Sequence, residues 1–235
     1  MSWLSEFRRR LRARRLLKQA DHPAFVEEYL AACGRSSDTR RDLAAFRFVV
    51  LDTETTGLDP HQAELLALGA VAVVGGSVRV ANSFEALVRP DQDASHANVE
   101  VHGILPAESR AGRSRAAVLA AFLSYIRADI IVAHNAGFDV TLLNRDLKAD
   151  FGIELLNPVL DTAVLARRLE DPTAASGGGS FAPGTFSLDR LAQKHGVPVK
   201  ERHSAHGDAF VTAQLLLALF AHARRRGLVS PADLL

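Results

Sequence analysis

The chain has 235 residues, 48% of them hydrophobic and 23% charged, so it can bury one sizeable α/β core and is not expected to be disordered. The single cysteine, Cys33, excludes an internal disulfide and a cysteine-based zinc site, which fits a reducing compartment. No apolar run approaches the roughly 20 residues that a bilayer requires, and no apolar stretch follows the N-terminal arginines as it does in a secretory signal. We therefore expect a cytoplasmic protein without a membrane span.

The charge is unevenly distributed, although the net value is only +1. Residues 1–20 contain seven arginines and lysines against one glutamate, a net charge of +6, which leaves −5 for the remaining residues. A basic arm of this kind is attracted to phosphates or acidic surfaces, and a solvated helix face explains the same residues equally well. The acidic remainder suits a domain whose carboxylates take up metal ions.

Residues 1–45 are predicted to form a basic helical extension. Trp3, Phe7 and Leu11 recur every four residues, and His22–Cys33 has the pattern of a second helix that ends at Gly34. The polar residues 36–41 then indicate a linker.

From Phe46 onward the pattern is that of strands, and later of strands alternating with helices. Strands are predicted at Phe46–Leu51, Leu66–Val74, Ser77–Val88, Ile130–Ala133 and Val159–Leu160. Helices are predicted at Arg113–Arg127, Phe138–Lys148, Thr162–Leu169, Ser187–His195 and His206–Arg225. This order indicates a mixed sheet with helices packed on its faces. We expect one domain over residues 46–228, with a mobile loop rich in Gly and Ser at 171–185 and a short tail at 229–235.

The first candidate site is the pair Asp52 and Glu54, which follows the predicted strand Phe46–Leu51. Side chains alternate along a strand, so the two carboxylates point to the same side and repel each other. A divalent ion with a preference for oxygen ligands, Mg²⁺ or Mn²⁺, is their natural partner. Gly57 then lets the backbone turn and approach a ligand. Taken alone, two acids at this spacing are common on protein surfaces.

The second candidate is the segment His134–Asp139, which follows the strand Ile130–Ala133. Open α/β sheets place ligands at the carboxyl ends of their strands. Asp139 lies in the first turn of the next helix, where the helix dipole alone also favours an acid. Phe138 is expected in the core or stacked on a base, and Asn135 either orients the loop or binds substrate.

The third candidate is the segment His203–Asp208. Five residues separate the histidine from the acid, so the two would lie on different sides of one helix. If Ser204 caps the helix, His203 lies in the preceding loop and Asp208 projects from the first turns. A loop histidine beside a metal site can accept a proton from water near neutral pH. His206 points elsewhere and is expected to be a surface histidine.

Four acids and a histidine, each where a strand ends or a helix begins, suit two-metal phosphodiester hydrolysis, with ions about 4 Å apart. The three segments resemble the Exo I, II and III motifs of the DEDDh (DnaQ-like) 3′→5′ exonucleases, which include the epsilon proofreading subunit of bacterial replicative polymerases. Further segments that resemble the family are Val101–Ile104, Leu160–Thr162 and Ser187–Asp189. The similarity covers about residues 46–225.

The resemblance implies a ribonuclease-H-like α/β fold, with a five-stranded mixed sheet flanked by helices. It also implies two divalent ions, Mg²⁺ or Mn²⁺: Asp52 touches both, Glu54 and Asp208 complete one site, and Asp139 supports the other. His203 would deprotonate the attacking water. The residues expected to bind the 3′ end of the substrate are Thr53, Thr55, Gly57, Leu58, His102, Asn135 and Phe138. Asp161 is expected to cap a helix and not to join the metal cluster.

The leading hypothesis is therefore a metal-dependent 3′→5′ exonuclease that acts on single-stranded or frayed 3′ ends of DNA, in proofreading or repair. An RNA-trimming member of the same superfamily and a catalytically silent nucleic-acid-binding module are the alternatives. The chain ends soon after its last predicted helix, without the long C-terminal tail of the epsilon subunit. Attachment to a polymerase is thus open, as is a role of the basic arm as a membrane-surface or partner helix.

Overall fold

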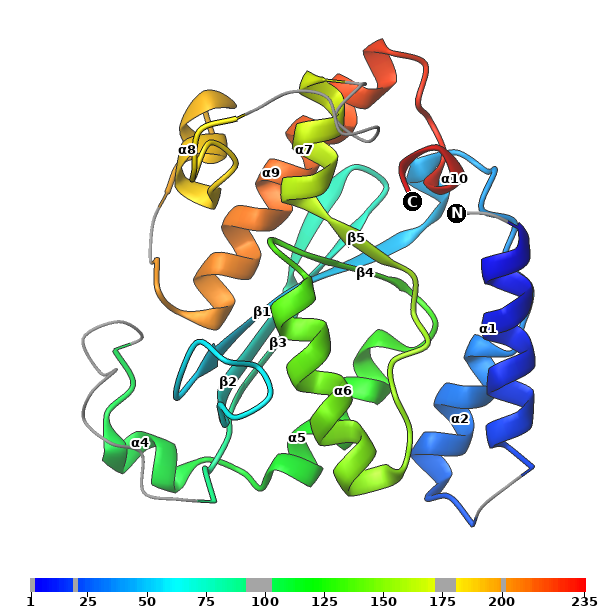
Figure 1. Cartoon of the computed structure of the whole chain (residues 1–235), viewed down its shortest axis with the longest axis vertical. Coiled ribbons are helices and arrows are strands. Elements are labelled where there is room, and N and C mark those ends of the chain that lie inside the picture. Colours follow the sequence, from blue (N-terminus) through cyan, green and yellow to red (C-terminus); the bar gives the residue numbers. More distant parts are fainter. Residues whose placement is uncertain (1–2, 19–20, 92–102, 172–180, 200–201) are drawn as a thin grey trace.

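The computed structural model describes residues 3–18, 21–91, 103–171, 181–199 and 202–235. Its centre is a five-stranded mixed sheet, which confirms the predicted fold class (Figure 1). The strands are β1 (Arg47–Thr55), β2 (Leu65–Val74), β3 (Ser77–Leu87), β4 (Ile130–Ala133) and β5 (Val159–Asp161). Their order in the sheet is β3-β2-β1-β4-β5. The first three strands pair antiparallel, whereas β4 pairs parallel with both β1 and β5.

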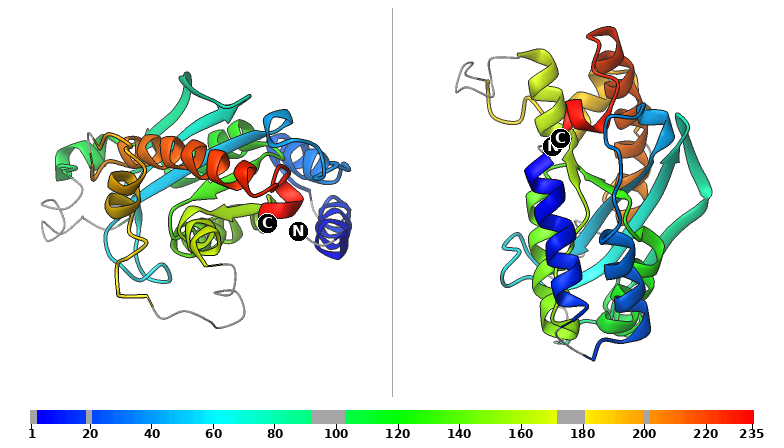
Figure 2. Two further views of the ribbon diagram at one scale, coloured as in Figure 1. Left: turned by 90° about the horizontal axis from the view of Figure 1, so that it is seen from above. Right: turned by 90° about the vertical axis from the view of Figure 1, so that its right-hand side faces the viewer.

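Helices cover both faces of the sheet (Figure 2). The helices are α1 (Trp3–Leu16), α2 (Ala24–Cys33), the 3₁₀ helix η1 (Leu43–Ala45), α4 (Pro106–Ala111), α5 (Arg115–Ile126), α6 (Gly137–Phe151), α7 (Thr162–Glu170), α8 (Leu188–Lys194), α9 (Ala205–Arg225) and α10 (Pro231–Leu234). One hydrophobic core joins the sheet to α2, α5 and α6, and a second joins it to α7, α8 and α9.

The buried part of β1 contributes to both cores because successive side chains of a strand point to opposite faces. Val49 and Leu51 belong to the core with α5 and α6, whereas Phe48 and Val50 belong to the core with α9. Even-numbered residues of β1 therefore face α9, and odd-numbered residues face α6.

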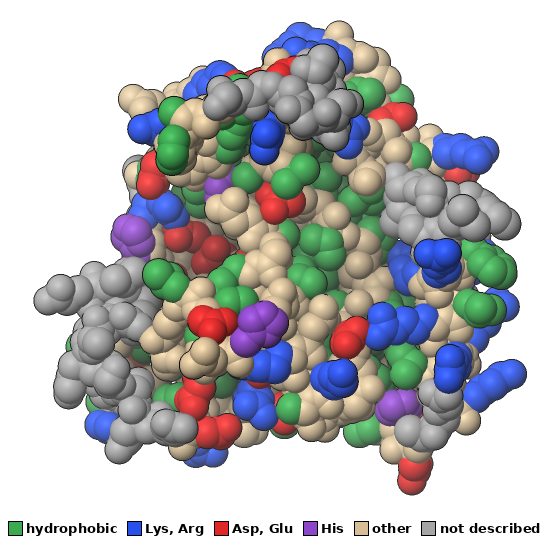
Figure 3. All heavy atoms as spheres, viewed as in Figure 1, with side chains coloured by type: hydrophobic (Ala, Val, Ile, Leu, Met, Phe, Trp, Pro, Cys, Tyr) green, Lys and Arg blue, Asp and Glu red, His purple; other side chains and the backbone are tan. Residues whose placement is uncertain are grey.

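The N-terminal helices are integrated into the first of these cores. Val26, Leu30 and Cys33 are fully buried in it. The Tyr29 hydroxyl donates a hydrogen bond to Asn157 Oδ1 at 2.7 Å. Lys and Arg side chains gather on the side of the molecule where α1 and α2 lie (Figure 3). Helices in residues 1–45 are thus confirmed, while a domain boundary at residue 45 stays a prediction.

Two features of the secondary structure differ from the prediction. Strand β1 continues through Thr55, because Asp52 and Glu54 pair with Gly69 and Ala67 of β2, so the two acids lie on the strand and not after it. The short helices α4 and α10 were not predicted, since four to six residues carry no helical periodicity. Most of the expected loop at 171–185 lies outside the described residues, and residues 181–187 form turns.

None of the helices in the described part of the chain has the length and apolar character needed to cross a membrane.

Candidate active site

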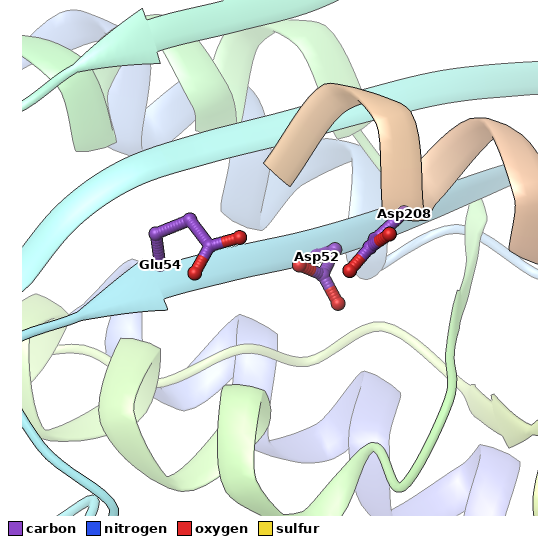
Figure 4. Close-up of side chains that lie close together, drawn as sticks. All are labelled: Asp52, Glu54 and Asp208. Carbon is purple, nitrogen blue, oxygen red and sulfur yellow. The ribbon is translucent and has the colours of Figure 1, made fainter. Parts of the chain in front are cut away.

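Three carboxylates converge where the end of β1 meets the first turn of α9. Asp52 and Glu54 come from β1 and Asp208 from α9 (Figure 4). One carboxylate oxygen of each lies within 4.8 Å of the others. The two strand acids share the even-numbered face, which is the face covered by α9. On the surface drawn in Figure 3, acidic side chains lie recessed in a hollow.

Helix α9 comes close enough to the sheet because Gly69 of β2 has no side chain. A Cβ atom at Gly69 would lie 2.3 Å from the carbonyl carbon of Ala205 and from the backbone nitrogen of His206. Gly69 pairs with Asp52 in the sheet, so the contact lies directly beside the carboxylates. The helix begins after Ser204, whose hydroxyl accepts a hydrogen bond from the Gly207 N–H at 3.1 Å, as the sequence predicts.

Asp139 approaches from the opposite face of β1. It lies in the first turn of α6 with only 5% of its surface exposed, and its Oδ1 accepts a hydrogen bond from the Thr53 hydroxyl at 2.7 Å. Thr53 is an odd-numbered residue of β1 and therefore faces α6. Asp139 is not one of the three carboxylates that lie within 4.8 Å of one another, but its charge raises the pKa of Asp52.

Asp161 fixes the loop that leads to Asp139. Its carboxylate caps α7, as predicted, by accepting hydrogen bonds from the N–H groups of Ala163 and Val164. It also accepts hydrogen bonds from the N–H groups of Asn135 at 3.2 Å and Ala136 at 2.9 Å. Asn135 adopts a left-handed backbone conformation with a φ of 59°, which asparagine tolerates better than most residues. One carboxylate thus holds together the starts of α6 and α7.

Burial and mutual repulsion raise the pKa values of three acids in the site. Burial, followed by the charges of Asp139 and Asp208, raises the pKa of Asp52 well above its ordinary value. Burial and the charge of Asp208 raise the pKa of Glu54 to about 7. Burial also raises the pKa of Asp139 to about 6, against the opposing hydrogen bond from Thr53. A divalent cation would stabilise all of these carboxylates in the charged form.

Arg202, which is not among the predicted site residues, supplies a positive charge to this cluster. Its guanidinium forms an ion pair with Asp208, and its Nε lies 2.8 Å from Asp189 Oδ1 of α8. The hydrogen bond from Arg202 lowers the pKa of Asp189. The available signal was a cationic residue directly before the His203–Asp208 segment.

His203 lies in the loop before α9, as the sequence predicts, with an exposed side chain. Its φ of 64° is uncommon for a residue other than glycine. Among the described residues, His203 is not one of the grouped candidate metal ligands. Its role as a base stays a prediction. His206 is not the surface histidine that we expected. It is half-buried with an enclosed Nε2, because the start of α9 packs against β2.

The remaining predicted substrate residues lie around this end of the sheet. The Thr55 hydroxyl donates a hydrogen bond to the Gly57 carbonyl at 2.7 Å. Leu58 is 95% exposed, and Phe138 is half-buried. Gly57 does not have a positive φ, so the turn there does not depend on the special backbone freedom of glycine. His102 lies outside the described residues.

The chemistry of these donors fits a divalent metal ion. All three grouped ligands are carboxylate oxygens, the type preferred by Mg²⁺ and Mn²⁺. Burial and neighbouring acids raise the pKa values of Asp52 and Glu54, and a bound cation would act in the opposite direction. The guanidinium of Arg202 at Asp208 shows that the cluster attracts a positive group.

The three carboxylates on this fold could hold a divalent metal ion, and comparisons with known proteins identify the family. Residues 49–216 match the model of the RNase T exonuclease family. The chain is 34% identical over 187 residues to a PolC-type DNA polymerase III of Thermotoga maritima, covering 80% of this chain and 13% of that protein. It is 34% identical over 206 residues to a DNA polymerase III subunit epsilon-like protein of Rhodobacter capsulatus, covering 86% of this chain and 28% of the relative.

Solved structures agree on the fold. The Escherichia coli exonuclease I–single-stranded DNA complex in its zinc-bound form superimposes with a TM-score of 0.64 at 19% identity, covering 77% of this chain and 42% of that one. Cell-death related nuclease 4 superimposes with a TM-score of 0.62 at 16% identity, covering 79% of this chain and 66% of that one. The chain belongs to the exonuclease family. The predicted superfamily and the enzyme class, a 3′→5′ exonuclease, are thereby confirmed, and the family implies dependence on a divalent metal.

Proposed function

We propose that the chain removes nucleotides from the 3′ end of single-stranded or frayed DNA, in proofreading or repair, by a mechanism that uses two Mg²⁺ or Mn²⁺ ions. The observation that carries the proposal is the convergence of Asp52, Glu54 and Asp208 within 4.8 Å, with Asp139 beside them on the opposite face of β1. Asp52 would contact both ions, Glu54 and Asp208 would complete one site, and Asp139 would support the other.

When bound, the ions supply positive charge to the attacking and leaving oxygens of the phosphodiester. The carboxylates contribute a fixed geometry, because β1 sets Asp52 and Glu54, and the capped start of α9 sets Asp208. His203 would accept the proton of the attacking water. Its exposed position in the loop before α9 lets it pass that proton to solvent.

The 3′-terminal nucleotide would lie between the loop after β1 and the start of α6. Leu58 offers an almost fully exposed apolar side chain, and Phe138 offers a half-buried aromatic ring. The aromatic ring can stack on a base without sequence preference, and the leucine side chain can pack against it. Thr53, Thr55, Gly57 and Asn135 would line the same space through polar and backbone groups.

The choice of DNA is supported by the named relatives, which are DNA polymerase III proteins, and by a structural neighbour solved with single-stranded DNA. The same relatives support a cytoplasmic location. The chain spans 13% and 28% of the length of these relatives, so attachment to a polymerase remains open within the proposal.

The test compares 5′-labelled single-stranded DNA and RNA of one sequence, at equal concentration, with and without Mg²⁺. We expect metal-dependent products that shorten stepwise from the 3′ end, faster on DNA than on RNA. Asp52→Ala should abolish the reaction, whereas replacement of the exposed Asp21 by alanine should leave it unchanged. Faster RNA degradation would identify an RNA-trimming enzyme, and binding without cleavage would identify a silent module.

A further inference from the structure

A pocket of about 400 Å³ opens at the Asn135 loop, and Asn135 is the one described lining residue that the proposed function already uses. Its described lining comes from three parts of the chain: the Asn135 loop, α7, and residues 181–187 before α8. Its described lining residues are Asn135, Arg167, Phe181, Ala182, Gly184, Thr185, Phe186 and Ser187.

The wall of this pocket is an ordered aromatic and cationic surface. The rings of Phe181 and Phe186 meet edge-to-face with centroids 4.9 Å apart. The guanidinium carbon of Arg167 lies 5.6 Å from the centre of the Phe181 ring. Backbone hydrogen bonds from Thr185 to Ala182 and from Ser187 to Gly184 hold the segment in consecutive turns. The aromatic rings therefore have defined positions on which a ligand can stack.

Two separate sets of contacts link the pocket to the active site. On one side, Asn135 stands in the loop that Asp161 holds in place, four residues before Asp139. On the other side, the segment leads directly into α8, where Asp189 binds Arg202, which in turn binds Asp208. A ligand in the pocket would therefore lie next to the groups that position the catalytic acids.

These groups match the chemistry of a nucleotide. Aromatic rings stack on a base, a guanidinium binds a phosphate, and an exposed asparagine amide can hydrogen-bond to a base edge or a sugar. We propose that this pocket binds a nucleotide of the substrate strand on the 5′ side of the one that is removed. This inference rests on the proposed function, because it assumes a nucleic-acid strand in the active site.

The test separates substrates that reach the pocket from a substrate that does not. The p-nitrophenyl ester of thymidine 5′-monophosphate carries a single nucleotide, whereas an oligothymidylate of eight residues extends past the active site. Phe181→Ala and Arg167→Gln should each raise the KM for the octamer about tenfold, the scale of one lost base or phosphate contact. Both variants should hydrolyse the ester with unchanged kcat and KM. Arg190→Gln, at an exposed position of α8, should behave as the parent on both substrates.

Binding of the fluorescently labelled octamer in EDTA, measured by anisotropy, gives a second readout that needs no catalysis. Parent-like octamer KM and affinity in both variants would overturn the proposal. An equal loss on the ester and the octamer would also overturn it, because that result indicates a structural effect on the catalytic acids. If the parent hydrolyses neither substrate, the proposed function fails, and the anisotropy measurement alone decides whether the pocket binds nucleic acid.

Discussion

Replacement of Asp139 by asparagine should stabilise the metal-free protein at high pH. The side chain is 5% exposed, and burial raises its pKa from an ordinary 3.8 to about 6. A difference of about two pKa units corresponds to about 3 kcal/mol of destabilisation by the charged form. The asparagine side chain keeps an oxygen that can accept the hydrogen bond from Thr53, so the variant removes the charge and preserves the contact.

The pH dependence follows from the direction of the shift. Between about pH 4 and pH 6 the native state binds the Asp139 proton more tightly than the unfolded state does, so the free energy of unfolding falls as pH rises. Above this range the full cost of the buried charge is present. The variant and the parent should therefore be equally stable near pH 4, and the variant should be more stable by up to about 3 kcal/mol at pH 8.

Urea denaturation in EDTA at pH 4 and pH 8 measures this difference. Asp21→Asn, which changes an exposed carboxylate, is the matched control and should have no effect. Addition of Mn²⁺ at pH 8 should stabilise the parent more than the variant, since the variant has lost a proposed metal ligand. Equal stability of Asp139→Asn and the parent at pH 8 in EDTA would refute the reasoning, as would a gain that is the same at both pH values.

Three further predictions concern the groups that hold the site. Arg202→Gln should tighten Mn²⁺ binding several-fold in calorimetric titrations, because the guanidinium competes for Asp208; unchanged affinity would exclude such competition. Gly69→Ala should destabilise the protein by about 3 kcal/mol and weaken Mn²⁺ binding, since its Cβ would collide with the Ala205 backbone. A parent-like melting temperature would show that α9 can move away from the sheet without cost. Asp161→Ala should cost about 2 kcal/mol by leaving backbone donors unpaired, and unaltered stability in urea would contradict this role.

The sequence predicted β2 and β4 well because both strands are apolar runs. Strand β4 was predicted with its observed bounds, and the turn at Gly75 and Gly76 separates β2 from β3 as expected. The end of β1 was misplaced because charged residues interrupt the apolar run there. Backbone pairing with β2 continues past Asp52 regardless of side-chain polarity, so hydrophobicity alone could not locate the end of this strand.

The site was predictable where spacing along one element decides the geometry, and not where distant segments meet. Alternation along β1 placed Asp52 and Glu54 on one side, and the Ser204 cap placed Asp208 at the start of α9. The contact between Arg202 and Asp208 depends on how a loop packs against α8, which leaves no periodic signal in the sequence. The integration of α2 into the core through Tyr29 is likewise a tertiary contact between residues far apart in the chain.

The division of the acids between two faces explains how the fold accommodates so much negative charge. The alternation that sends Phe48 and Val50 towards α9 continues through Asp52 and Glu54, so these acids lie at the edge of an apolar core and do not interrupt it. Asp139 lies toward the opposite face of β1 and accepts a hydrogen bond from Thr53. Because the charge of Asp139 acts on Asp52, a cation bound at Asp52 would reduce the repulsion of both groups at once. Strand β1, paired with β4 up to Val50 and with β2 through Thr55, is therefore the element on which the geometry of the proposed metal site depends.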